Sequence, residues 1–413
     1  MKKIALLLSL VLMLSAVGCG SQMKSDVLME DKNPGKVTNL DEFSDENVVI
    51  TDFGVRLFRE SVDTKKNTLI SPLSVIYALA MTANGAENET LNEMEEVLGM
   101  PVSELNEYLC AYQKALPQDK KYQMNLANSI WFLDDESFKV NKEFLEINSD
   151  YYGAGIYKTP FNDDTVVDIN NWVKKHTNEM IPAILDEIPE DAVMYLINAL
   201  AFEAEWETTY FDYQVRPGEF YLEDGSTQQV DYMSGEERMY LEDENTTGFL
   251  KYYVDRKYAF AALLPEEGMS MGEYVSSLDG EKINSLLENA KEGNVFTSMP
   301  KFETEYEVSM KEILEEMGMI KAFDKEDAEF EKLGTSEYGN IYISRVLHKT
   351  FISVAEKGTK AGAATMVEVA TEGAMEIKDP KYVDLDRPFV YMLIDCETNI
   401  PFFIGTTMQV NNK

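Results

Sequence analysis

The first regular apolar pattern in the chain begins near residue 47 and has helical spacing. Its apolar side chains recur three or four positions apart, at Val49, Ile50, Phe53, Leu57 and Phe58. This spacing places them on one face of an α-helix. The pattern therefore predicts an amphipathic helix at the start of the folded part of the chain.

Two further helices follow, each with recognisable end signals. Ser71 precedes Pro72, and this pair suits an N-cap followed by the first helical position. The helix that they begin is apolar on nearly all sides, so we expect it to be buried. Thr90, with Glu93 three residues later, predicts a capping box for a short helix that ends at Gly99.

Beyond residue 126 the pattern changes to strands with only two more helices. Amphipathic helices are predicted for residues 166–180 and 308–320. Strands are predicted for residues 127–132, 193–202, 258–264, 341–355, 389–394 and 402–408, with a hairpin turn at 222–226. Since helices dominate the first half and strands the second, the order predicts one α+β domain over residues 47–413.

Residues 356–372 also have the two-residue period of a strand, although their composition resembles that of a linker. From Thr359 onward each odd position is small or β-branched and uncharged, while the charges fall on Lys360, Glu368 and Glu372. Side chains two positions apart share one face of a strand. The segment therefore has one face that can be buried, and it could be a loop in one state and a strand in another.

The charge of the chain limits its partners. Its 37 basic and 74 acidic residues give a formal net charge of −37, and 45% of its residues are hydrophobic. Strong negative charge disfavours phosphate groups, so we expect no nucleic-acid partner and no docking on anionic lipid heads. The apolar content suffices for a large core.

The N-terminal residues have the features of an export signal. Lys2 and Lys3 precede an apolar stretch that is too short for a permanent membrane span, which predicts a signal peptide over residues 1–18. The sequence Ala16-Val17-Gly18-Cys19 resembles a bacterial lipobox, so we expect cleavage before Cys19 and lipidation of its thiol. Residues 19–46 are polar and acidic, and we expect a flexible tether of roughly 30 Å. The predicted location is extracellular, on the bacterial cell surface.

The remaining residues that could bind metal or react are few. Cys110 and Cys396 lie in apolar contexts, and two buried thiols are favoured over a disulfide. The chain has two histidines and neither a CxxC pair nor an HExxH motif, so we predict no metal site and no cofactor.

One short motif allows an enzyme as an alternative. Gly268-Met269-Ser270-Met271-Gly272 matches the G-x-S-x-G motif of hydrolases, with His348 downstream as a possible base. No HGG-type oxyanion loop precedes it, and no parallel sheet is predicted. A surface turn is the favoured interpretation of Ser270, and a buried core side chain is the favoured interpretation of His348.

Six separated motifs together resemble one protein family, the serpins. In chain order they are Ser71-Pro72-Leu73-Ser74, Asn198-Ala199 with Phe202 and Trp206, Met299-Pro300-Lys301-Phe302, Val346-Leu347-His348-Lys349, Glu356-Lys357-Gly358-Thr359 and Arg387-Pro388-Phe389-Val390. The resemblance covers nearly the whole domain. It implies three β-sheets, eight or nine helices and an exposed reactive-centre loop over residues 356–386.

The resemblance also implies a function, which is suicide inhibition of proteases rather than catalysis. A serine or cysteine protease cleaves the loop and is trapped as an acyl-enzyme while the loop inserts as a new central strand. The resemblance assigns the shutter to Ser71, Ser74, Asn198 and His348, and the breach to Trp206. It assigns the hinge to Glu356, Gly358, Thr359, Ala361, Gly362, Ala363, Ala364 and Thr365.

The spacing typical of the family places the scissile bond between Glu372 and Gly373. The chain between Glu372 and Arg387 is longer than usual for the family, so the register could shift. The second candidate is Met375 before Glu376, and Lys378 is a distant third. Glu372 implies a glutamate-preferring target, whereas Met375 implies a target of the elastase or chymotrypsin type.

We therefore expect a monomeric, secreted, lipid-anchored inhibitor whose partner is an extracellular protease. Its only membrane contact would be the N-terminal lipid anchor. A non-inhibitory serpin that acts as a binding module is the first alternative, and the Ser270 esterase is the second.

Overall fold

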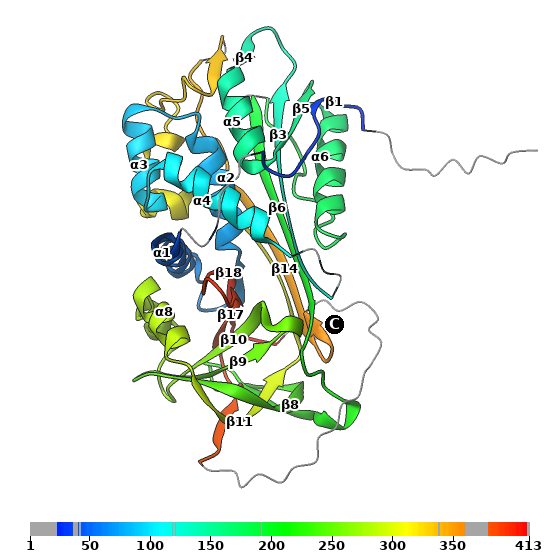
Figure 1. Cartoon of the computed structure of the whole chain (residues 1–413), viewed down its shortest axis with the longest axis vertical. Coiled ribbons are helices and arrows are strands. Elements are labelled where there is room, and N and C mark those ends of the chain that lie inside the picture. Colours follow the sequence, from blue (N-terminus) through cyan, green and yellow to red (C-terminus); the bar gives the residue numbers. More distant parts are fainter. Residues whose placement is uncertain are drawn as a thin grey trace, which may run out of the picture.

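The computed structural model describes residues 23–35, 40, 43–117, 119, 121–190, 192–337, 339–359 and 379–410 of the chain. The molecule is elongated (Figure 1). Most helices surround the upper half, the strands β8 to β11 lie in the lower half, and long strands run between the two halves.

The described residues form nine α-helices. They are α1 (Ser44–Ser61), α2 (Pro72–Ala83), α3 (Asn88–Leu98), α4 (Val102–Ala115), α5 (Lys142–Tyr152), α6 (Asp163–His176), α7 (Met271–Ser276), α8 (Gly280–Glu288) and α9 (Lys311–Glu316). As predicted, the Ser71 side chain caps α2 by accepting a hydrogen bond from the amide of Ser74, and Pro72 takes the first helical position.

A seven-stranded sheet joins the two halves of the molecule. Its strands, in spatial order, are β1 (Asp26–Met29), β5 (Gly155–Thr159), β3 (Tyr122–Leu133), β6 (Met194–Glu205), β15 (Gly358–Thr359), β14 (Leu347–Ala355) and β12 (Phe302–Ser309). The short β15 is therefore the only element of the described chain that separates β6 from β14 in this sheet.

Two other sheets complete the fold. The nine-stranded sheet contains β16 (Lys381–Asp384), β11 (Lys291–Pro300), β8 (Thr227–Glu242), β9 (Thr246–Tyr252), β10 (Tyr258–Pro265), β17 (Phe389–Asp395), β18 (Pro401–Thr407) and β2 (Thr68–Ile70), with β7 (Val215–Tyr221) paired to β8. A two-stranded sheet pairs β4 (Phe138–Val140) with β13 (Gly334–Ser336). The prediction of an α+β fold with three sheets is confirmed.

The central strand β6 is covered on both faces, as its nearly continuous apolar sequence predicts. Leu200, Phe202 and Ala204 join the large core that includes α2. Ile197 and Ala199 face the other way, into a smaller core formed with Trp172 and other residues of α6. This alternation decides which side of the sheet each neighbouring residue faces.

Several predicted boundaries differ from those observed. Thr90 does not cap α3, because the helix begins earlier, at Asn88, and the Thr90 hydroxyl instead accepts a hydrogen bond from the amide of Glu329. The predicted strand over 341–355 begins only at Leu347. The predicted helix over 308–320 shortens to α9, since β12 continues to Ser309.

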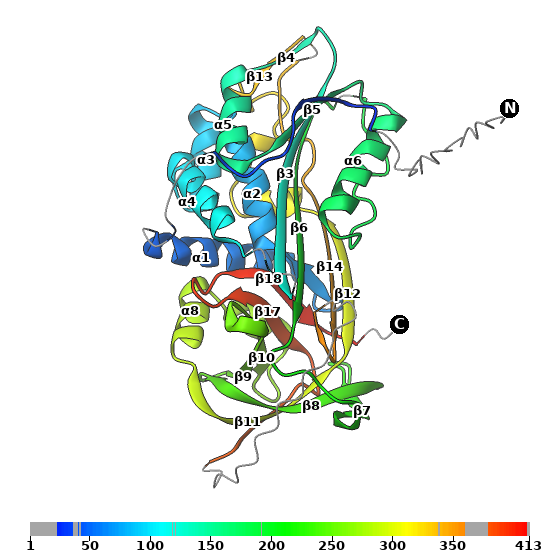
Figure 2. The same ribbon diagram turned by 45° about the vertical axis from the view of Figure 1, so that its right-hand side comes forward.

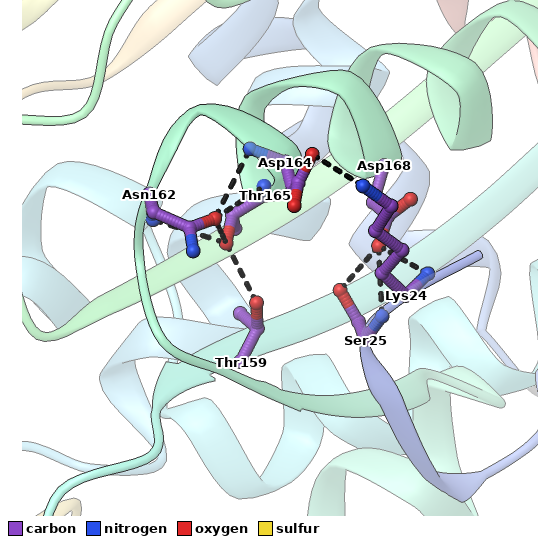
Figure 3. Close-up of polar contacts among 7 residues, drawn as sticks. All are labelled: Lys24, Ser25, Thr159, Asn162, Asp164, Thr165 and Asp168. Atoms are coloured by element: carbon purple, nitrogen blue, oxygen red, sulfur yellow. Dashed lines mark hydrogen bonds and ion pairs between the residues drawn. The ribbon is translucent and has the colours of Figure 1, made fainter.

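The most informative departure concerns residues 23–35, which we expected within the flexible tether. They lie along the upper edge of the seven-stranded sheet, where β1 pairs antiparallel with β5. The Asp168 carboxylate on α6 accepts hydrogen bonds from the amides of Lys24 and Ser25 and from the Ser25 hydroxyl, at 2.9, 2.8 and 2.7 Å (Figure 3). Composition missed this segment because its stability comes from distant partners.

Residues 31–35 of the same segment make further contacts with α6 and with the chain around residues 150–153. The Asp31 carboxylate lies 3.2 Å from Nε2 of His176, the last residue of α6. The amide of Lys32 donates to the carbonyl of Gly153, and that of Gly35 donates to the carbonyl of Asp150. We call residues 23–35 the N-terminal strap. Among the described residues, no helix is long and apolar enough to cross a bilayer.

Candidate functional site: hinge, breach and shutter

The predicted hinge begins with a tight turn between β14 and β15. Val354 pairs with Thr359 and Ala355 with Gly358, so Glu356 and Lys357 form the turn. On its other side β15 pairs with Glu205 and Ala204 of β6. The two residues of β15 therefore occupy the first positions of a strand between β6 and β14.

Glycine is required at position 358 for two reasons. Its φ of +154° lies in a region that side chains rarely adopt, and an added Cβ would lie 2.0 Å from the carbonyl oxygen of Ala204. The backbones of β15 and β6 can approach this closely only because residue 358 has no side chain.

Thr359 is buried at 1% relative exposure. Because it pairs with Ala204, its side chain faces the large core, where its hydroxyl contacts the hydroxyl of Tyr253. Burial raises the pKa of Tyr253 well above its ordinary value, so the phenol stays protonated and can donate. The Thr359 side chain therefore faces the core, as the two-residue pattern of the segment predicts.

Trp206 holds the turn from the β6 side. Its indole Nε1 donates to the carbonyl of Ala355 at 2.8 Å, and its amide donates to the carbonyl of Lys357 at 2.9 Å. Its ring stacks on Tyr253 with centroids 4.4 Å apart. Trp206 thus connects the end of β6 to the turn, at the place assigned to the breach.

An ion pair fixes the outside of the same turn. Lys301 Nζ lies 2.7 Å from Oε1 of Glu356. Partial burial raises the pKa of Glu356, but the hydrogen bond and charge of Lys301 outweigh that effect, so the pKa lies below its ordinary value. The carboxylate therefore stays charged at neutral pH.

The predicted shutter residues meet further along the strands. His348 is buried on β14 and its Nε2 accepts a hydrogen bond from the amide of Ser71 at 3.0 Å. Burial lowers the pKa of His348 to about 4, so the ring is neutral at pH 7. Ser71 also accepts the capping bond from Ser74. The histidine thus connects β14 to the start of α2.

Asn198 lies on β6 and pairs across the strands with Asn128 of β3. Its amide Nδ2 donates to Oδ1 of Asn128 at 2.8 Å, and Asn128 donates to the carbonyl of Tyr152. The Oδ1 atom of Asn198 is buried and accepts no hydrogen bond from the described residues. A buried acceptor without a donor is an unsatisfied polar group, which a rearrangement of the sheet could satisfy.

A cavity of about 180 Å³ separates these residues. Ser74, Asn198 and His348 line it together with apolar side chains from α2, from β6 and from the chain before β14. The cavity lies where β6 and the chain before β14 have no strand between them in the described residues. The residues predicted as shutter and breach therefore lie along the same side of β6, where the described residues supply only β15 as a neighbour.

The remaining predicted site residues lie outside the described part of the chain. These are Cys19, Lys360, the hinge residues Ala361, Gly362, Ala363, Ala364 and Thr365, and the candidate scissile residues Glu372, Gly373, Met375, Glu376 and Lys378. On either side of residues 360–378 the chain is described: it ends in β15 at Thr359 and resumes at Asp379, before β16, the orange-red strand at the lower end of the molecule (Figure 2).

The Ser270 motif forms a helix cap. The Ser270 hydroxyl lies 2.7 Å from the carboxylate of Glu273, and it accepts from the amide of Glu273 to begin α7. His348 is bonded to Ser71 instead. These contacts favour the surface-turn interpretation of Ser270. In the described residues Cys110 and Cys396 form no disulfide, and burial raises the pKa of Cys396 to about 12.

Sequence reasoning missed two partners in this site, Asn128 and Tyr253. The contact of Asn128 with Asn198 could have been predicted, because one polar residue inside each of two buried strands indicates a cross-strand pair. Tyr253 follows another tyrosine in a β-rich region, and nothing in that pattern points to the hinge.

Comparison with known proteins identifies the family. The family model for serpins, serine protease inhibitors, matches residues 49–410, so the chain belongs to the serpin family. The crystal structure of tengpin, a thermophilic serpin, in its native state is 48% identical, covers 94% of this chain and 100% of its own, and superimposes with a TM-score of 0.87. Tengpin in the latent state gives a TM-score of 0.80 at 47% identity, covering 92% of this chain and 100% of its own.

A relative of known sequence is more distant. An uncharacterized serpin-like protein of Thermococcus kodakarensis is 28% identical over 87% of this chain and 84% of its own length. The TM-score is higher for the native than for the latent form of tengpin, and among the described residues only β15 lies between β6 and β14.

Proposed function

We propose that this serpin inhibits extracellular serine or cysteine proteases by covalent trapping coupled to loop insertion. The observation that carries the proposal is the gap between β6 and β14, in which β15 already occupies the first two strand positions. An inserted strand would extend β15 along β6 and pair with backbone groups on both sides.

The covalent step follows from ordinary protease chemistry. The hydroxyl or thiol of the target attacks the carbonyl carbon of Glu372, the peptide bond to Gly373 breaks, and the amine of Gly373 leaves with the proton. An ester or thioester then joins the target to Glu372. Insertion of the cleaved segment carries the target along the sheet before water can hydrolyse that bond.

The composition of the hinge supports inhibition over a purely binding role. From Thr359 to Thr371 the odd residues are small or β-branched and uncharged, as a strand inserted over a packed core requires. Thr359, the first of them, is already buried. A non-inhibitory binding module would not need this pattern.

A panel of purified proteases tests the proposal. We expect a target that prefers glutamate or methionine to form an SDS-stable complex and to release a C-terminal fragment. Cleavage without a complex by every protease that cuts the loop would contradict inhibition. The N-terminal sequence of the fragment distinguishes Gly373 from Glu376 as its first residue.

We also propose that the protein is secreted and anchored as a monomer through lipidated Cys19, on the basis of the signal sequence. Mass spectrometry of the N-terminal peptide from the membrane fraction tests this. An unmodified Cys19, or a longer N-terminus that keeps the apolar stretch, would contradict the lipid anchor.

A further inference from the structure

The N-terminal strap brings structure close to the proposed lipid anchor. Met23, its first residue, follows Cys19 by four positions. An extended chain spans at most about 3.6 Å per residue, so this leash reaches roughly 14 Å. The anchor therefore has little freedom relative to the strap, unlike the tether of roughly 30 Å predicted from composition.

The strap is attached to the body of the fold at several independent points. Asp168, at 5% exposure, accepts three hydrogen bonds from Lys24 and Ser25 (Figure 3). The pairing of β1 with β5 and the contact between Asp31 and His176 extend the attachment. The direction of the strap is thus fixed relative to the sheet.

The same end of the molecule exposes apolar side chains. Val27, Leu28 and Met29 on β1 are 43, 52 and 39% exposed, and Val167 on α6 is 53% exposed. Exposed aliphatic side chains next to a lipid anchor can enter the interface of a bilayer. The anchor keeps their local concentration at the membrane high, so weak contacts suffice.

Charge decides which lipid this surface fits. Asp164 is paired with Lys24, and Asp134 with Lys158. Asp26 and Glu30 are exposed carboxylates at the two ends of β1. With a chain charge of −37 as well, this end fits a zwitterionic surface better than an anionic one.

β16, the described strand that follows residues 360–378, lies far from β1. β1 lies near the top of the long axis and β16, which follows the segment, lies at the bottom (Figures 1 and 2). β15, which precedes the segment, pairs with Ala204 and Glu205 at the C-terminal end of β6. β1 and β16 thus lie at opposite ends of the long axis.

From these observations we infer that the anchored protein stands on the membrane with β1 and α6 against a zwitterionic bilayer surface and with β16 directed away from it. The inference rests on the proposed lipidation of Cys19. Its consequence is that the end of the molecule that carries β16 faces the surrounding medium.

Lipid quenching of site-specific labels tests this orientation. Full-length lipidated protein carries a fluorophore on Leu28→Cys or, as the matched control, on Tyr382→Cys, which is 67% exposed on β16. Both are made in a Cys396→Ser background, since Cys110 is fully buried. In phosphatidylcholine vesicles with headgroup-nitroxide lipid, we expect at least threefold stronger quenching at position 28 than at 382.

A second pair of variants tests the short leash itself. A ten-residue Gly-Ser insertion directly before Met23 should lower quenching at position 28 at least twofold, while the same insertion after Val410 should not. Equal quenching at both labels, or no effect of the insertion before Met23, would overturn the orientation while lipidation stands. Unmodified Cys19 and no co-sedimentation with vesicles would overturn the anchor and the orientation together.

Discussion

The central strand β6 is paired to a different extent on its two sides. On one side β3 pairs with it along its length, from Tyr122 opposite Ala204 to Phe132 opposite Met194. On the other side, the described residues pair with it only at Gly358 and Thr359. Beyond these two residues lies the cavity that Asn198 and His348 line.

The two sides also differ in how their polar groups are satisfied. On the β3 side, Asn128 both accepts from Asn198 and donates to the carbonyl of Tyr152. On the open side, Asn198 retains an acceptor without a donor. Among the described residues, β6 is therefore paired along its length on one side and at only two positions on the other, so a further strand could pair only on the second side.

The largest expected effect comes from charging the strand that would fill the open side. Ala363→Arg places a guanidinium on the predicted inward face, so insertion would bury an unpaired charge. That burial costs about 3 kcal/mol or more, which lowers the yield of SDS-stable complex roughly 100-fold in favour of cleaved inhibitor.

The neighbouring residue supplies the control. Ala364 has the same size and lies on the predicted outward face. Ala364→Arg should therefore form complex nearly as the parent does. If the two variants partition alike between complex and cleaved protein, the predicted phase of the inserted strand is wrong.

A second large effect is expected where the hinge enters the sheet. Gly358→Ala combines an unfavourable φ with a Cβ 2.0 Å from the carbonyl oxygen of Ala204. Backbone strain and the clash should lower the free energy of unfolding by about 3 kcal/mol. Urea unfolding followed by circular dichroism measures this change.

Gly293→Ala is the matched control, because an added Cβ there meets no atom within 4 Å. Its unfolding midpoint should stay close to that of the parent. A Gly358→Ala variant with an unchanged midpoint would show that β15 does not lie between β6 and β14 in solution.

The sequence predicted some of these features, such as the buried faces of β14 and of the hinge, but not the N-terminal strap. The alternation in β14 and the small odd residues after Gly358 are local patterns, so they predicted the buried face with His348 and the inward direction of Thr359. The N-terminal strap has no such pattern. Its order depends on Asp168, more than 140 positions away, and composition carries no signal of that contact.

The bonds between breach and hinge were also hidden from the sequence. Trp206 was assigned through the family motif, but its bond to Ala355 and its stacking on Tyr253 join three separate segments. Position 341 was predicted as the start of a strand, yet β14 begins at Leu347, because its partner β12 ends at Ser309, opposite Leu347. Periodicity cannot show where a partner strand ends.

A pH effect should distinguish the shutter from other parts of the molecule. His348 has a folded pKa of about 4, against an ordinary value of 6.5. The unfolded chain therefore binds more protons between pH 6.5 and 4, so the free energy of unfolding falls as the pH falls through this window. The full loss below pH 4 is about 3 kcal/mol.

Urea midpoints of the parent and of His348→Gln, taken from pH 7 to pH 4, check this expectation. Glutamine can still accept from the amide of Ser71 but does not titrate, so the variant should lose that part of the pH dependence. His176→Gln is the comparison, since it removes the other histidine. A pH dependence in His348→Gln equal to that of the parent would refute the assignment to His348.

The smallest expected effect compares two tryptophan substitutions, one on each side of β6. Trp206→Phe removes the 2.8 Å bond to Ala355 on the open side, and Trp131→Phe removes a 2.9 Å bond to Ser129 away from it. Each indole also stacks on a tyrosine, Tyr253 or Tyr157, so the two changes are similar in kind. Each should lower the free energy of unfolding by about 1 kcal/mol.

Their effects on inhibition should differ despite this equal cost in stability. Of these two indoles, only that of Trp206 is bonded to the turn from which an inserting strand would start, so only Trp206→Phe should change the ratio of complex to cleaved inhibitor. Densitometry of SDS gels with one target protease measures that ratio for both variants. If Trp131→Phe changed it equally, the ratio would depend on stability as a whole, and the open side of β6 would have no special part in trapping.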